Sequence, residues 1–169
     1  MDFVLMLSAF FSVATALVLL ATLAVIDFKT MYLPNIYVFP FAVLGVVFHV
    51  LTGFTLISCQ DMLVGAAFGY GVLWLIRFFG NMYYKTDSLG LGDVKLMGAA
   101  GLWLGFASVT TALTLGAAAG LCHGLIVAYF NSRKTGSFNI QRLKIPAGPG
   151  FIIGITIMII IDIFPYFTR

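Results

Sequence analysis

Two of the six aspartates in this 169-residue chain border apolar runs, where a charge is costly. Asp27 comes at the end of one run, in LAVIDFKTMYLPN, and Asp93 comes at the start of another, in GLGDVKLMGAAG. An ionised aspartate carried toward hydrocarbon costs on the order of 3 kcal/mol, so such a residue usually faces a bundle interior or a wet cavity. We therefore expect a partner or a function to offset this cost at both positions.

Two carboxylates that face each other can share one proton, because like charges at close range do not both ionise easily. One carboxylate can then act as a base toward a water molecule, while the other, protonated, polarises a carbonyl group. This is the chemistry of an aspartic peptidase. Asp27 and Asp93 lie far apart in the sequence, so only tertiary packing can bring them together.

Each aspartate also has neighbours that favour non-helical backbone. Gly90 and Gly92 allow conformations closed to other residues, and they let a substrate backbone approach with no side chain in the way. Pro34 fixes its own φ and disfavours helix at Leu33, which predicts an extended or turned segment before the next apolar run. Irregular backbone at a membrane boundary is tolerated where it lines protein or a water-filled cavity, which hydrolysis inside a membrane requires.

Taken singly, each aspartate has a purely structural interpretation. Asp93 is a favoured residue for a helix N-cap, where it would accept a hydrogen bond from the first free amides. Asp27 would be a boundary residue in water beside Lys29. Neither interpretation explains the backbone chemistry around both residues. The remaining aspartates are interpreted as solvated loop charges or interfacial charges: Asp2, Asp61, Asp87 and Asp162.

The amino-acid composition indicates whether the helices that hold these residues are surrounded by water or by lipid. Hydrophobic residues make up 62% of the chain and charged residues 9%, and the mean hydropathy is +1.09. Such a chain cannot cover a water-facing surface with polar groups. Apolar runs of about 20 residues, enough to cross about 30 Å of hydrocarbon, recur along its length. The sequence predicts an all-α integral membrane protein, in which residues 1–169 form a single membrane-embedded domain.

We expect a polytopic bundle of about six transmembrane helices, at residues 3–26, 36–51, 62–79, 94–104, 109–130 and 149–164. The stretch 94–130 is apolar and carries no acidic residue. As one helix it would be about 55 Å long, far beyond a bilayer, so it must turn, and residues 105–108 are the predicted place. The first run is long and has no basic region before it, which predicts a retained span and not a cleaved signal peptide.

The distribution of lysine and arginine supports this arrangement. With six spans, Arg169 is the only basic residue on the membrane face where both chain termini lie. A five-span arrangement would scatter the basic residues over both faces. Because basic loops face the cytoplasm, the first, third and fifth loops are predicted to be cytoplasmic and both termini external. Asp27 and Asp93 then lie at one depth, on the cytoplasmic side. The other eight of the nine basic residues lie in these three loops and their flanks: Lys29, Arg77, Lys85, Lys95, Arg133, Lys134, Arg142 and Lys144.

Neither a metal site nor a cofactor is predicted. Cys59 and Cys122 are far apart and neither belongs to a C-x-x-C pair. His49 and His123 lie within or near predicted spans, where a lone histidine usually packs or hydrogen-bonds between helices. No further ligands occur at a matching depth.

These motifs resemble those of the type IV prepilin leader peptidases, the bacterial members of the aspartic peptidases named for their G-x-G-D motif. The resemblance rests on VIDFKTMYLPN, GLGDVKLMGAAGLWLG and KIPAGPGF, which span most of the chain in the family's order. It implies that Asp27 and Asp93 form the catalytic pair. It also implies a set of substrate-binding or site-shaping residues: Leu33, Pro34, Asn35, Gly90, Gly92, Lys95, Pro146, Gly148 and Pro149. Ala147 departs from the pattern, because the family commonly has an aromatic residue there.

The resemblance further implies an endopeptidase of the bacterial inner membrane that cuts prepilin-like proteins between a polar leader and the hydrophobic helix that follows it. The implied partners are prepilin-like substrates, membrane lipid and pilus assembly proteins, with no nucleic acid. Long family members carry an additional cytoplasmic domain that N-methylates the new amino terminus, often with zinc-binding cysteines. This chain resembles the short form found with tight-adherence (Flp) pilus systems, so methyltransferase activity is not expected.

Two other functions stay open at this stage. The aspartates could bind a cation or relay protons in a small transporter or channel, although the internal repeats common in transporters are not found here. The chain could instead be a non-catalytic membrane subunit of a secretion or pilus assembly, with the aspartates as helix caps. Asp93→Asn separates a cap from a catalyst, because asparagine caps about as well as aspartate.

Overall fold

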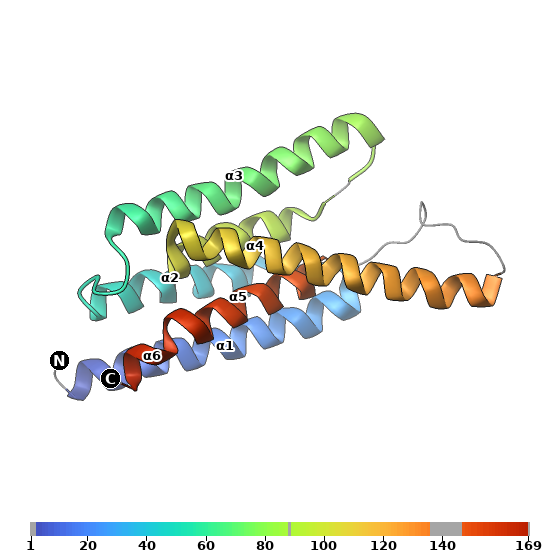
Figure 1. Ribbon diagram of the computed structural model, residues 1–169. Helices are drawn as coiled ribbons and strands as arrows, with labels where there is room; N and C mark the ends of the chain where they lie inside the picture. Colours follow the sequence, from blue (N-terminus) through green and yellow to red (C-terminus); the bar gives the residue numbers. More distant parts are fainter. Residues whose placement is uncertain (1–2, 88, 136–146, 169) are drawn as a thin grey trace.

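The computed structural model of the protein describes residues 3–87, 89–135 and 147–168, and these residues form helices and connecting segments without a strand. The fold class is therefore all-α, as predicted. Figure 1 shows the long helices lying side by side, with both chain ends at the same end of the bundle. The helices are α1 (Phe3–Thr30), α2 (Asn35–Leu51), α3 (Cys59–Tyr84), α4 (Leu91–Thr135), α5 (Gly148–Asp162) and the short α6 (Phe164–Phe167).

α4 is the central element of the bundle. It packs against α2, α3 and α5, while α1 packs against α2 and α5. α4 also folds back on itself, so that its first half runs toward the end that carries the termini and its second half runs away again (Figure 1). The start of α4, the end of α1 and the start of α5 are thereby gathered at the opposite end of the bundle (Figure 1).

The reversal in α4 occurs at Gly105, within the predicted stretch 105–108. Gly105 has φ 70° and ψ −176°, a backbone conformation that is essentially restricted to glycine. The carboxylate of Asp61 accepts a hydrogen bond from the Phe106 N–H at 3.2 Å, and a Cβ on Gly105 would collide with the other Asp61 oxygen. The prediction that Asp61 is simply a solvated loop charge is wrong, because its carboxylate binds the first backbone N–H of the second half of α4.

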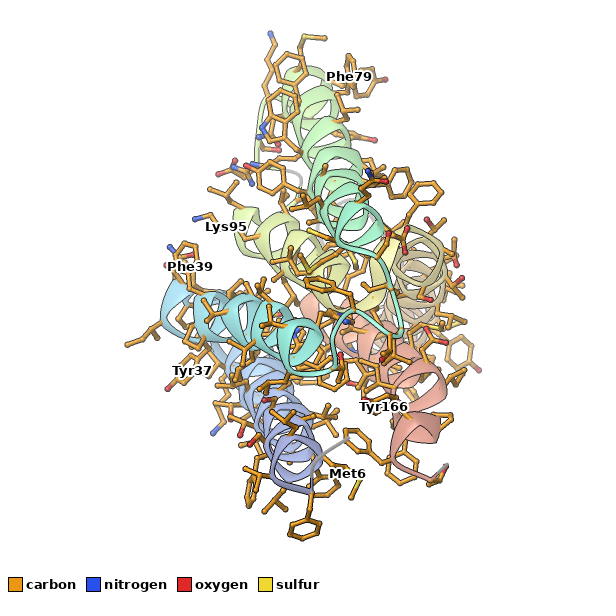
Figure 2. The ribbon with its side chains drawn as sticks, turned by 90° about the vertical axis from the view of Figure 1, so that its left-hand side faces the viewer. Met6, Tyr37, Phe39, Phe79, Lys95 and Tyr166 are labelled. Atoms are coloured by element: carbon orange, nitrogen blue, oxygen red, sulfur yellow. The ribbon has the colours of Figure 1, made fainter. Side chains whose placement is uncertain are left out.

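Four described segments are long and apolar enough to cross a membrane: Phe3–Thr30, Cys59–Tyr84, Leu91–Phe130 and Gly148–Phe167. α2 is a shorter apolar helix, and the third of the four segments contains the reversal at Gly105. Many large apolar side chains point away from the bundle, such as Phe39 and Phe79 in Figure 2, whose exposed fractions are 60% and 58%. Lipid contact accounts for such a surface, because a helix that satisfies its own backbone hydrogen bonds can present apolar side chains to the bilayer.

Trp103 fixes the position of α4 against α2. Its ring is buried and stacks on Phe41 and Phe48, with ring centroids 5.7 and 5.5 Å apart. Its Nε1 donates a hydrogen bond to the Phe41 carbonyl oxygen at 2.8 Å. Gly45 provides the space, because a Cβ there would lie 2.8 Å from the indole ring. The polar end of a large aromatic residue is thus satisfied inside an apolar bundle.

Small residues set the separation of the other helices. A Cβ on Gly69 of α3 would lie 2.5 Å from the Met97 carbonyl oxygen of α4, and one on Gly116 of α4 would lie 2.8 Å from the Phe151 Cα of α5. Backbones that approach this closely leave no room for larger side chains. These close approaches hold α3 against the first half of α4, and the second half of α4 against the start of α5.

Candidate functional site

Asp27 of α1 and Asp93 of α4 lie together at the start of α5. Their side chains are buried, with exposed fractions of 4% and 7%. A Cβ placed on Gly148, the first residue of α5, would lie 2.5 Å from Asp27 Oδ2 and 3.1 Å from Asp93 Oδ1. The two oxygen atoms are therefore separated by no more than the sum of these two distances. Tertiary packing brings together two carboxylates that are distant in sequence.

Neither of these two oxygen atoms has a hydrogen-bond partner among the described residues. The two carboxylates interact electrostatically, and the backbone amide of Gly148 interacts favourably with Asp27. A helix N-terminus favours negative charge nearby, so the start of α5 partly compensates the carboxylate. Two buried acceptors without a donor are complementary to a proton, or to a water molecule that both can bind.

Gly148 is needed at this point because any side chain would collide with the Asp27 carboxylate and crowd that of Asp93. Pro149 follows it in the first turn of α5 and is buried, where a missing N–H does no harm. These two residues of the predicted set therefore lie at the site. Pro146, the third member of the same motif, lies outside the described residues.

Asp27 is not at the end of the first helix, contrary to prediction. α1 continues to Thr30, whose hydroxyl donates to the Ile26 carbonyl oxygen at 2.9 Å, and the non-helical segment begins only at Met31, with φ 52°. The interpretation of Asp27 as a boundary residue in water is also wrong, because its side chain is buried inside the bundle. Pro34 does have extended backbone, with ψ 132°, and precedes α2 as predicted.

Asp93 is not an N-cap. It is the third residue of α4, and its Oδ2 lies 2.8 Å from the point where a Cβ on Gly90 would stand. Gly90 precedes the helix and is non-helical, as predicted, but neither Gly90 nor Gly92 has positive φ, so neither adopts a conformation closed to other residues. Their smallness matters instead, since a Cβ on Gly92 would lie 2.7 Å from the Leu33 Cβ. The start of α4 can therefore press against the segment that follows α1.

A cavity of about 100 Å³ adjoins the two aspartates. Since a water molecule occupies about 30 Å³ of liquid, the cavity has room for a few waters. Lys95 extends from α4 on the side where α2 begins (Figure 2), and its Nζ donates to Asn35 Oδ1 at 3.2 Å. This contact ties the two sequence motifs together. The residues lining the cavity are Asp27, Met31, Tyr32, Leu33, Gly90, Leu91, Gly92 and Asp93.

Arg77 of α3 is a neighbour of the site, although its sequence position indicates only a basic residue of the third loop. Its guanidinium donates to the Leu89 carbonyl oxygen and to Asp87 Oδ1, the second at 2.6 Å. Asn81 donates to the same Asp87 oxygen at 3.2 Å. Asp87 is therefore paired and not merely solvated, and α3 holds the segment that leads into Gly90. An acidic residue shortly before G-x-G-D indicates that a basic partner is present. The sequence does not reveal that this partner is Arg77, because the pairing depends on tertiary packing.

Comparisons with known proteins identify relatives of this chain. The prepilin leader peptidase/N-methyltransferase of Escherichia coli (strain K12) is 38% identical over 114 residues, which cover 68% of this chain and 49% of that protein. The protein of the same name from Pectobacterium carotovorum subsp. carotovorum is 38% identical over 114 residues, covering 66% and 40%. That from Aeromonas hydrophila is 32% identical over 130 residues, covering 77% and 42%. No solved structure gives a significant match to the chain.

The chain spans about half the length of these curated relatives, or somewhat less. Residues 14–125 match the family model described as the type IV leader peptidase family, and this range contains Asp27 and Asp93. The apolar helices and this match together indicate a multi-pass protein of the inner membrane. Because the match covers well over half of the sequence, the chain belongs to the type IV leader peptidase family.

Proposed function

We propose that the chain is an intramembrane aspartic endopeptidase that removes the leader peptide of type IV prepilins. The observation that carries this proposal is the meeting of Asp27 and Asp93 as two buried carboxylates without donors, beside a small cavity. The names of the related proteins, which include prepilin leader peptidase, support the choice of substrate. Residues 1–169 act as one membrane-embedded peptidase domain.

In the proposed reaction, the two carboxylates share one proton and bind a water molecule. The ionised carboxylate removes a proton from the water molecule, and the water oxygen attacks the scissile carbonyl carbon. At the same time the protonated carboxyl donates its proton to the carbonyl oxygen. The tetrahedral intermediate then breaks at the C–N bond, and the amine leaves with a proton from the first carboxyl. The second carboxylate takes back a proton from a hydroxyl group of the intermediate, which becomes the carbonyl of the new carboxyl terminus. Gly148 lets the two carboxylates approach each other, and its amide stabilises the charge on Asp27.

The other members of the predicted set shape the site in this proposal. Gly90, Gly92 and Leu33 line the cavity, and the Asn35–Lys95 contact holds α2 against the start of α4. Pro34 keeps the segment between α1 and α2 extended, and Pro149 begins α5. Pro146 belongs to the set on sequence grounds alone.

The proposal also assigns the site to the cytoplasmic face of the inner membrane, with both termini outside. The excess of lysine and arginine in the first, third and fifth loops supports this orientation. The substrates are prepilins of the Flp or tight-adherence kind, and pilus assembly proteins are further partners. A prepilin would present the junction between its leader and its apolar helix at the depth of the two aspartates.

The test is a processing assay with full-length protein in native membranes. Asp27→Asn and Asp93→Asn should each reduce leader removal from a co-expressed prepilin by at least about 100-fold, the contribution typical of general acid–base catalysis. Mass spectrometry of the pilin reads the cleavage. Asp2→Asn, the same chemical change at a third aspartate, serves as the matched control. Full processing by either site variant at normal protein level would contradict the assignment, and proton or cation flux lost with the aspartates would favour a transporter.

A further inference from the structure

A second polar region lies at the opposite end of the bundle, where α2 and α5 end, and the proposed peptidase reaction does not use it. A cavity of about 410 Å³ is found there. Its polar lining includes His49, Ser108 and Asp162, and its apolar lining includes Leu56, Ile57 and Ile161. Ionisable side chains inside a membrane protein are costly, so a pair beside one cavity calls for an explanation.

Asp162 occupies an unfavourable place for a carboxylate. It is the last residue of α5, where the helix dipole is negative and favours a cation. Its Oδ2 is buried and has no hydrogen-bond partner among the described residues. Within the same described ranges, the only ion pair joins Arg77 to Asp87, so no cation of the described residues pairs with Asp162.

His49 adds a second hydrogen-bond acceptor, the ring nitrogen Nδ1. Its role as an acceptor follows from the hydrogen bond made by the other ring nitrogen, Nε2. The side chain is fully buried, and Nε2 lies 3.0 Å from the Trp103 carbonyl oxygen. A carbonyl oxygen can only accept, so Nε2 must carry the proton. The neutral ring then presents Nδ1 as an acceptor, and this atom has no partner among the residues that the structure describes. An unmade hydrogen bond of this kind is expensive to leave buried.

We propose that this cavity binds the ammonium group of a primary amine. The two partnerless atoms are both acceptors, one of them on a carboxylate, and the Ser108 hydroxyl can accept a third hydrogen bond. A primary ammonium group offers three N–H donors and one positive charge, which matches this set. Leu56, Ile57 and Ile161 provide an apolar wall for the carbon chain of the ligand.

A metal ion fits the same region less well. No group of three or more His, Cys, Asp or Glu side chains that could hold a metal occurs in the described part of the chain. Alkali and alkaline-earth ions prefer oxygen ligands, whereas one of the two free acceptors here is an imidazole nitrogen. The donor set therefore favours N–H groups.

In a membrane, the ammonium group can come from an aminophospholipid headgroup or from a soluble amine. Both sources share the chemistry that the cavity recognises. The matched probe is phosphatidylcholine, which carries the same charge as phosphatidylethanolamine but has three methyl groups in place of the N–H donors. Choline and ethanolamine form the equivalent soluble pair.

The experiment uses the full chain in nanodiscs of mixed lipid, with bound lipid measured by native mass spectrometry. The wild type should retain phosphatidylethanolamine over phosphatidylcholine by about tenfold or more, as expected for charge-assisted hydrogen bonds. Asp162→Asn should remove most of this preference. Ser108→Phe, which fills the cavity but leaves Asp162 and His49 in place, should do the same, so the result does not depend on one variant.

A second measurement distinguishes the two sources. In discs of phosphatidylcholine alone, ethanolamine should raise the Tm of the wild type more than choline does, and Asp162→Asn should abolish the difference. A response to ethanolamine without lipid preference would assign the site to a soluble amine. No preference in either assay, or a preference that both variants retain, would overturn the proposal. Neither readout involves cleavage of a prepilin, so the result stands apart from the proposed function.

Discussion

At the scale of single residues, the candidate site depends on an absent side chain as much as on its two carboxylates. Asp27 and Asp93 converge on Gly148, and the two carboxylates can approach each other only because no side chain stands on its Cα. The two carboxylates were identified from their cost in an apolar chain. The role of Gly148 rested on resemblance alone, because nothing in its local sequence reveals which side chains approach it.

Gly148→Ala should impair prepilin processing far more than stability. The new methyl group would stand 2.5 Å from Asp27 Oδ2 and 3.1 Å from Asp93 Oδ1, so the carboxylates must move apart. We expect at least about a tenfold loss of processing, since small displacements in a catalytic site have large effects on rate. The processing assay above measures it.

Gly71→Ala is the matched control for this change. Gly71 lies within α3, and a Cβ there would meet nothing within 4 Å. Alanine in place of a helical glycine stabilises by up to about 1 kcal/mol, so this variant should process normally. Equal processing by Gly148→Ala and Gly71→Ala would contradict the proposed role of the space at Gly148.

At the scale of elements, α3 contributes to the site without supplying a residue to its cavity. Among the helices it packs mainly on α4, and Arg77 links it to the segment before Gly90 through Leu89 and Asp87. The guanidinium binds a carbonyl and a carboxylate at once, which a lysine cannot do in the same geometry. The orientation of the first turn of α4, and with it Asp93, is thereby tied to α3.

Arg77→Met should lower the processing rate by about tenfold, and Arg77→Lys should restore part of it by keeping the charge beside Asp87. Both effects should appear in the rate at saturating prepilin, because Arg77 orients the site and lies outside its cavity. Initial rates at varied substrate concentration check this. A loss confined to apparent substrate affinity, or identical behaviour of the two variants, would speak against a positioning role.

The reversal inside α4 is the second feature at this scale. Gly105→Ala would force an unfavourable φ of 70° on alanine and push a methyl group into the Asp61 carboxylate. We expect a loss of about 1 to 3 kcal/mol of stability from the backbone strain, with more from the collision. Thermal unfolding in detergent, compared with Gly71→Ala, measures this. An unchanged Tm would mean that the chain can reverse without this conformation.

Helix positions could be predicted well at this scale, and helix ends less well. Hydropathy and the length limit of a bilayer predicted the apolar segments and the turn near Gly105. They did not predict that α1 runs past Asp27, because the last turn is held by local hydrogen bonds such as that of Thr30 to Ile26. The pairing of Arg77 with Asp87 likewise required the packing of α3 on α4, which has no signature in hydropathy.

At the scale of the whole molecule, the fold separates two polar regions by the length of the bundle. The end of α1 and the start of α4, which hold Asp27 and Asp93, lie at one end of the bundle (Figure 1). The ends of α2 and α5, which hold His49 and Asp162, lie at the end that carries the termini. The proposed orientation assigns the first region to the cytoplasmic face and the second to the outer face. It rests on the charge distribution and can be tested directly.

An impermeant maleimide should label Cys59 from outside intact spheroplasts in a Cys122→Ser background. Cys59 begins α3, is exposed and lies at the end of the bundle that carries the termini. A cysteine introduced by Lys85→Cys, at the other end of α3, should be labelled only after the membrane is opened. The reverse pattern would invert the proposed orientation, and with it the side on which a prepilin is cut.

The reversal at Gly105 also has a consequence for hydrophobic mismatch. The half of α4 before Gly105 rises only about 21 Å, less than the roughly 30 Å of bilayer hydrocarbon. This half is also enclosed by the bundle, with Val94, Leu96 and Met97 fully buried, so surrounding lipid cannot adjust to its length. If its Gly105 end is level with one membrane surface, its first turn stops short of the other. Asp93 then stands below the headgroups at the bottom of a shallow recess in the protein, where water has less hydrocarbon thickness to cross.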